Sequence, residues 1–208
     1  MKPALEALLQ HPSIFRPGDD RSQPPGLASG WPALDAVLPG GGWPQRALIE
    51  LLPAGAGIGE LSLLLPALRE AMTAGQGMAL VHPPYVPYAP ALQQAGLDPA
   101  QVLFIQPPQA RDGVWAMEAC LRSGILGAVL GWLEQPVTQP VLRRLALAAE
   151  LHDGLAFVFR PMAAAEQPSP AALRMALAPR PDGLQVTVLK CRGRPPRSVL
   201  VALDPHDV

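Results

Sequence analysis

Apolar and polar positions alternate between two kinds of segment along the chain. Short runs that are apolar almost throughout predict buried strands at 47–52, 78–82, 102–106, 128–133 and 155–159. Between these runs, apolar residues recur at helical spacing and predict helices at 59–74, 90–95, 113–123 and 137–152. Strands and helices that alternate in this way predict an α/β fold with a mostly parallel central sheet flanked by helices.

The pattern changes after residue 170. Apolar residues at 173–178 and 184–190 predict two strands, and the Pro-Arg-Pro-Asp-Gly segment at 179–183 between them is typical of a tight turn. Residues 197–203 predict a third adjoining strand. The fold is therefore expected to carry a C-terminal antiparallel hairpin extension.

The N-terminal residues have a different composition from the rest of the chain. Residues 1–26 contain a proline-rich segment that prevents regular structure, and we expect them to form an arm. We expect residues 27–208 to form one domain. Ile14 and Phe15 in the arm either pack back on the domain or contact a partner.

Composition restricts the classes of function. Charged residues are 16% of the chain, hydrophobic residues 49%, and the net charge is −1, which favours a protein-binding role and predicts weak or indirect DNA contact. No apolar run reaches the roughly 18 residues of a membrane helix. Cys120 and Cys191 have no metal-site or redox spacing, and we expect buried thiols in a cytoplasmic protein.

The glycine-rich turn after the first strand resembles a nucleotide-binding loop that has lost its functional side chains. A P-loop has the pattern G-x-x-x-x-G-K-[ST], in which backbone amides and the lysine hold phosphates. Here the glycines are Gly55, Gly57 and Gly59, Glu60 stands at the lysine position and Leu61 at the Mg²⁺-binding hydroxyl. A carboxylate about 4 Å from a phosphate charge costs about 4 kcal/mol at an effective dielectric of 20. The loop is therefore predicted to be degenerate, and the chain to be no enzyme, with no cofactor, metal or catalytic residue.

Residues 29–44 and 48–50, before this loop, resemble the opening segment of the RecA family. In the same register, Pro84 stands where RecA proteins have a catalytic glutamate, and Gly131-Trp132 where they have the Mg²⁺-coordinating aspartate. Glu134 is either a displaced acid or a surface carboxylate. The resemblance implies a RecA-like, P-loop-type core with vacant ATPase positions.

Segments 40–44, 82–88, 120–124, 159–161, 169–174 and 189–193 resemble the ImuA family. This resemblance implies a non-catalytic adaptor of SOS-induced translesion DNA synthesis, in a mutasome complex with ImuB, an error-prone DNA polymerase of the alpha-subunit type and RecA itself. A homo-oligomer is left open. Segments 131–133 and 160–161 are also similar to the SulA family, which gives the alternative of a cell-division inhibitor that binds the division polymer protein.

Two groups of residues are candidate partner contacts. Basic residues gather in the C-terminal segment, where Arg174 precedes Arg180, Lys190, Arg192, Arg194 and Arg197. They form either a positive patch for carboxylate or phosphate, or a solvated hairpin face. Tyr85 and Tyr88, in a proline-rich loop, are the second group. Trp115 and Trp132 are expected to pack in the core.

Overall fold

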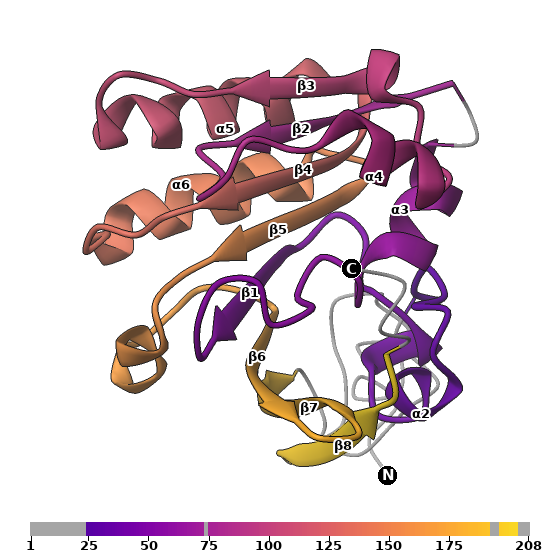
Figure 1. The fold of residues 1–208 in the computed structure, drawn as a ribbon. Coiled ribbons are helices and arrows are strands. Elements are labelled where there is room, and N and C mark those ends of the chain that lie inside the picture. The colour runs from indigo at the N-terminus through magenta and orange to yellow at the C-terminus, as the bar shows by residue number, and fades with distance from the viewer. Residues whose placement is uncertain (1–23, 73–74, 192–195, 204–208) are drawn as a thin grey trace, which may run out of the picture.

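The computed structural model of the protein describes residues 24–72, 75–191 and 196–203 (Figure 1). Its strands are β1 (Leu48–Pro53), β2 (Gly77–Val81), β3 (Val102–Ile105), β4 (Leu126–Trp132), β5 (Leu155–Phe159), β6 (Leu173–Arg180), β7 (Gly183–Cys191) and β8 (Arg197–Val201). Its α-helices are α2 (Pro32–Asp35), α3 (Leu65–Met72), α4 (Ala89–Gln94), α5 (Ala110–Ser123) and α6 (Gln139–Glu150). The predicted arm lies almost wholly outside the described residues, so the arm and its boundary with the domain stay a prediction.

All of these strands join one sheet in the order β3-β2-β4-β5-β1-β6-β7-β8. Every neighbouring pair from β3 to β6 is parallel, and β7 and β8 add antiparallel strands at the other edge. The predicted α/β fold, with a mostly parallel sheet and a C-terminal antiparallel hairpin, is confirmed. The relation to the P-loop core of RecA stays a prediction.

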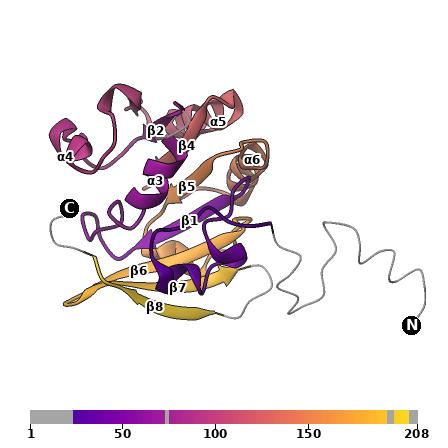
Figure 2. The ribbon, with the colours of Figure 1, turned by 90° about the vertical axis from the view of Figure 1, so that its right-hand side faces the viewer.

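Successive residues of each strand point to opposite faces of the sheet and build two cores. On one face, Leu80 of β2 and Phe157 of β5 pack with α2 and α3. On the other face, Val81 and Val158 pack with α5 and α6. Figure 2 shows α3 and α4 on one side of the sheet and α5 and α6 on the other. The two sides are unequally covered, because α3 and α4 are much shorter than α5 and α6.

Two elements differ from their predicted bounds for reasons of backbone geometry. The helix expected from residue 59 begins at Leu65, because Gly59 has a φ of 93°, outside the helical region, and residues 60–64 form turns. The hairpin turn is shorter than predicted, because β6 and β7 pair as far as Arg180 and Gly183. Only Pro181 and Asp182 remain between these strands.

Candidate functional site

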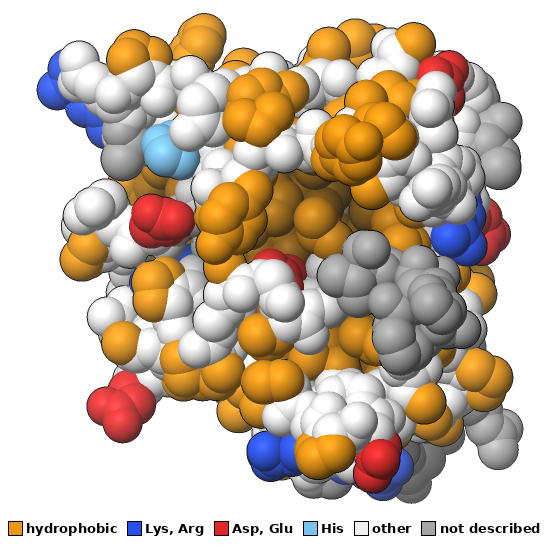
Figure 3. All heavy atoms as spheres, in the orientation of Figure 1, with side chains coloured by type: hydrophobic (Ala, Val, Ile, Leu, Met, Phe, Trp, Pro, Cys, Tyr) orange, Lys and Arg blue, Asp and Glu red, His pale blue; other side chains and the backbone are white. Residues whose placement is uncertain are grey.

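A hollow lies over the carboxyl ends of the parallel strands, where α/β proteins usually bind their ligands (Figure 3). One pocket, of about 240 Å³, lies under the segment that follows β2. A second, of about 250 Å³, lies between the segments that follow β1 and β5. The two pockets share Glu60, Pro84 and Trp132, and therefore form one depression, which we call the hollow. The walls of the first pocket are mostly apolar: Leu65, Leu68, Met78, Leu80, Leu92, Leu97 and Trp132.

The degenerate loop is closed by its own carboxylate. Glu60 is only 6% exposed, and its Oε1 and Oε2 accept hydrogen bonds from the backbone N–H groups of Gly57 (3.0 Å) and Ile58 (2.8 Å). Backbone amides of this kind hold phosphate in a P-loop. An incoming anion would have to displace the carboxylate and then lie beside it. Glu60 therefore does more than repel a phosphate, because it occupies the donors that a phosphate would use.

The other positions that ATP chemistry needs are filled by apolar groups. Trp132 at the end of β4 stacks on Phe159 at the end of β5, with ring centroids 4.5 Å apart and ring planes 10° apart. Leu61 is 39% exposed, and Pro84 lies on the wall of the hollow. Over the residues that the structure describes, no group of three His, Cys, Asp or Glu side chains is arranged to hold a metal ion.

Tyr85 and Tyr88, two of the predicted partner contacts, line the hollow. Their exposed fractions are 70% and 71%, and Val86 between them is 77% exposed. Tyr85 and Tyr88 belong to the segment between β2 and α4, and the structure brings them together with Gly57, Gly59, Glu60 and Leu61 of the degenerate loop. Residues that are 24 to 31 positions apart in sequence thus form one apolar site with exposed aromatic side chains.

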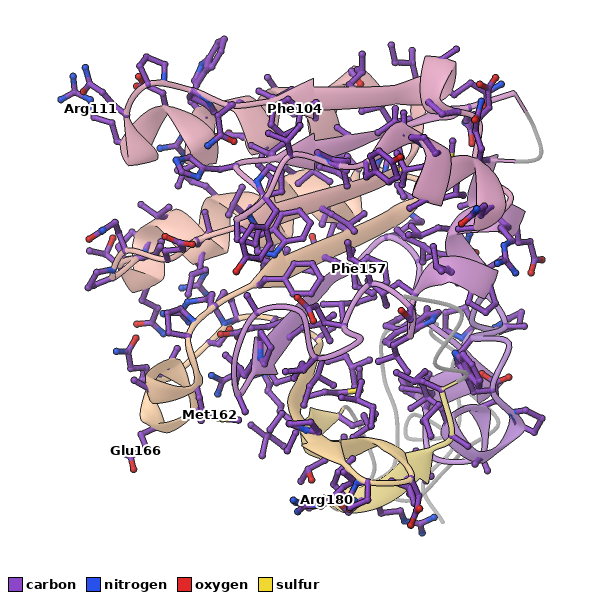
Figure 4. All side chains as sticks on the ribbon, in the orientation of Figure 1. Phe104, Arg111, Phe157, Met162, Glu166 and Arg180 are labelled. Atoms are coloured by element: carbon purple, nitrogen blue, oxygen red, sulfur yellow. The ribbon has the colours of Figure 1, made fainter. Side chains whose placement is uncertain are left out.

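The structure does not bring the predicted basic contacts to this hollow. Arg180 lies at the hairpin turn (Figure 4), whereas Lys190 lies seven residues, or roughly 23 Å, further along β7 from Gly183. Arg197 of β8 pairs with Val188, five residues from Gly183. Lys190 donates a hydrogen bond from Nζ to the carbonyl oxygen of Ser169 at 2.8 Å. Arg192 and Arg194 lie outside the described residues. A contact role for these residues stays a prediction.

Arg174 was expected in the basic patch, and this expectation is wrong because the side chain is buried. Its Nε donates to Oε2 of Glu50 at 2.8 Å, and Nη1 of Arg160 donates to Oε1 of the same carboxylate at 2.7 Å. Glu50 is completely buried. The Arg174 and Arg160 guanidinium groups also bond the Ala164 carbonyl and the Gln167 side chain, at 2.8 and 2.9 Å, and so fix the segment after β5.

Sequence reasoning missed this buried ion cluster, although a signal for it was present. Glu50 is the only charged residue in an otherwise apolar strand, and a buried carboxylate requires partners. The signal predicts that cationic partners exist, but it does not indicate which arginines supply them.

The two tryptophan predictions have different outcomes. Trp132 is 8% exposed and packs against Phe159, as predicted. The prediction that Trp115 packs in the core is wrong, because its side chain is 68% exposed. The core-facing positions of α5 are Ala116, Met117 and Leu121, and Trp115 is directed away from them.

The remaining predictions concern thiols and membranes. Cys120 and Cys191 are partly buried, and burial raises the pKa of the Cys120 thiol, which keeps it protonated near neutral pH. Among the helices that the structure describes, none is long and apolar enough to span a membrane.

The chain is similar to several proteins named cell division inhibitor SulA. It is 31% identical over 119 residues to that of Edwardsiella piscicida, a match that covers 57% of this chain and 70% of the relative. It is 30% identical to that of Klebsiella aerogenes, over 51% of this chain and 63% of the relative. For that of Serratia proteamaculans the identity is 33%, over 49% of this chain and 60% of the relative.

A solved structure has the same name. The crystal structure of SulA from Pseudomonas aeruginosa is 26% identical, and the match covers 57% of this chain and 99% of that one. Its TM-score of 0.45 is too low to establish a shared fold. No protein-family model matches the chain.

These relatives correct the predicted function. The prediction of a translesion-synthesis adaptor is wrong, and with it the predicted role in mutagenesis and the predicted partners ImuB, error-prone polymerase and RecA, because the relatives are named cell division inhibitors. Two arginines in the segments that carried the ImuA resemblance have structural roles, since Arg160 and Arg174 both donate hydrogen bonds to buried Glu50. Such residues maintain a fold and do not identify a partner. With 31% identity over 70% of a SulA protein, the chain belongs to the SulA family.

Proposed function

We propose that this protein is a non-enzymatic cell-division inhibitor that binds the division polymer protein through the hollow bordered by Tyr85 and Tyr88. The proposal includes the RecA-like origin of the core and action in the cytoplasm, both of which the sequence favours. The names of the relatives support cell division as the process in which the protein acts. The apolar hollow supports the proposed place of the binding surface.

The observation that carries the proposal is the exposure of Tyr85, Val86 and Tyr88 beside an apolar pocket. Aromatic side chains that border a pocket are typical of the residues that dominate the binding energy of protein interfaces. Exposing three large side chains to water is unfavourable in the free protein, and a partner that covers them recovers this free energy.

The loop next to the hollow supports a binding role over catalysis. Because Glu60 bonds the Gly57 and Ile58 amides, the loop keeps a fixed shape with no bound anion. A rigid loop presents Leu61 in one arrangement beside the tyrosines, and little conformational entropy of the loop is lost when a partner binds.

The test is an assembly assay with the purified division polymer protein. We expect this chain to reduce polymer mass in sedimentation and light scattering. The double variant Tyr85→Ala/Tyr88→Ala should lose about tenfold or more in inhibitory potency, as expected for two interface anchors. Ile125→Ala is the matched control, because Ile125 is 69% exposed and lies outside the hollow.

Two results would contradict the proposal. One is unchanged polymer mass at a large molar excess of the chain. The other is equal potency of the double variant and the unsubstituted protein, with circular dichroism confirming that both are folded. Turnover of ATP by the chain would contradict the non-enzymatic part separately.

A further inference from the structure

A second depression lies on the other side of the sheet, where α5 and α6 begin. It has a volume of about 650 Å³, and we call it the α5–α6 groove. Its floor and walls contain Val114 and Trp115 of α5, Val141 of α6, and Leu133 and Val137 before α6. Figure 4 shows Arg111 at the beginning of α5, far from the hairpin turn marked by Arg180. The groove shares only Trp132 and Glu134 with the hollow, and it does not contain Tyr85 or Tyr88.

Trp115 makes this groove unusual. The chain has four tryptophans. Trp43 and Trp132 are buried, and the indole N–H of Trp31 donates to the carbonyl oxygen of Leu63 at 2.9 Å. Trp115 is the fourth, and 68% of its side chain is exposed. An exposed indole on a rigid helix, beside an apolar floor, is typical of an interface anchor.

The charged groups along the groove are mainly cationic. Among the described lining residues, Arg111 and Arg144 carry guanidinium groups and Glu134 carries a carboxylate. The Arg111 side chain is 80% exposed, and its Nε lies 3.7 Å from the carboxylate of Asp112. Arg144 bonds Glu118, and its side chain remains 57% exposed. Both guanidinium groups therefore keep donors directed at solvent, in a fork geometry that suits carboxylates.

We propose that the α5–α6 groove binds a short acidic segment of a protein partner that carries an aromatic or aliphatic side chain. The apolar side chain packs on Trp115 and Val141, and the flanking carboxylates accept hydrogen bonds from Arg111 and Arg144. The two guanidinium groups remain largely exposed, and they favour an acidic segment over a neutral or basic one. This site does not depend on the proposed inhibition of division, because it shares no partner-contact residue with the hollow.

The test measures fluorescence anisotropy of two labelled synthetic peptides with the full chain. The acidic probe has a phenylalanine and a leucine among aspartates and glutamates, and the neutral probe replaces every acid by its amide. We expect the acidic probe to bind at least about tenfold more tightly, with an affinity that falls as salt is added.

Variants assign the binding to the groove. Trp115→Ala should weaken the acidic probe about tenfold or more, as truncation of an anchor does. Arg111→Gln should weaken it and flatten the salt dependence, whereas Arg111→Lys should retain that dependence. Ile125→Ala is the control, since Ile125 is as exposed as Trp115 and lies outside the groove.

Four results would overturn the proposal. They are equal affinity for the two probes, no binding of either probe at about millimolar concentration, unchanged binding by Trp115→Ala, and self-association of the chain that Trp115→Ala abolishes. The last result would assign the groove to a second copy. None of these measurements uses the division polymer protein, so a negative result here does not test the proposed binding of that protein at the hollow.

Discussion

Two buried carboxylates, Glu50 and Glu60, are held by contrasting means. Glu50 bonds the side chains of Arg160 and Arg174, which lie 110 and 124 residues away in sequence. Glu60 bonds two backbone amides that lie two and three residues before it. The first carboxylate connects β1 to β6 and to the end of β5, so it stabilises the sheet. The second fixes one loop, so it shapes a binding surface.

The largest effect is expected from neutralising Glu50. Glu50→Gln leaves two buried guanidinium groups without a counter-charge and should lower the free energy of unfolding by about 3–5 kcal/mol. Urea denaturation measures this loss. Glu150→Gln, at an exposed position of α6, is the control and should change stability by less than about 0.5 kcal/mol. If both variants lose the same small amount of unfolding free energy, Glu50 contributes no more to stability than a surface acid, and the prediction is wrong.

A smaller effect is expected from Glu60, because its partners are amides that water reaches once the loop opens. Glu60→Ala should cost about 1–3 kcal/mol, and Glu60→Gln less, since the amide oxygen retains one acceptor. The vacated amides should also bind anions. Sulfate should therefore raise the thermal midpoint of Glu60→Ala more than that of the unsubstituted chain. An equal sulfate response in both would mean that Glu60 does not occupy an anion position.

His152 is buried like Glu50 and Glu60, and it should make the stability of the protein depend on pH. It is fully buried at the end of α6, and desolvation lowers its pKa below the usual value of 6.5. The unfolded chain therefore binds more protons below about pH 6.5, so the free energy of unfolding should fall as the pH falls from there. Denaturation between about pH 7.5 and pH 5, roughly the range in which histidines titrate, measures the slope. His152→Gln should flatten it, and an unchanged slope would assign the pH dependence to other groups.

The smallest effects on stability are expected at the two ends of the hairpin. Arg180→Glu and Arg197→Glu alter exposed side chains and should each change the free energy of unfolding by less than about 0.5 kcal/mol. In the polymer assembly assay, reduced inhibition by one variant alone would identify that end of the hairpin as a partner contact. If both variants inhibit as strongly as the unsubstituted chain, the basic residues of the hairpin form a solvated face and not a partner contact.

Local pattern was enough to predict most of the fold. The apolar runs at 128–133 and 155–159 correspond closely to β4 and β5, because a central strand buried on both faces needs apolar residues at every position. The vacant ATPase positions were also visible, since Glu60 and Leu61 can be read directly from the loop pattern.

Contacts that depend on three-dimensional geometry were not predictable. The bonds of Glu60 require the left-handed backbone at Gly57 and Gly59, which the residue order permits but does not specify. The pairing of Glu50 with Arg160 and Arg174 depends on the strand order. Trp115 was misplaced because Ala116 and Met117 follow it directly, and a shift of one position along a helix turns a side chain by about 100°.

Because the loop carries its own anion, its conformation should not depend on the ATP concentration in the cell. In a protein whose loop binds ATP, by contrast, the conformation changes as the nucleotide concentration rises and falls. Here the Gly57 and Ile58 amides are occupied by a permanent part of the chain. Under the proposed function, the strength of inhibition then depends on how many copies of the protein are present, and synthesis and degradation are the steps at which a cell controls it.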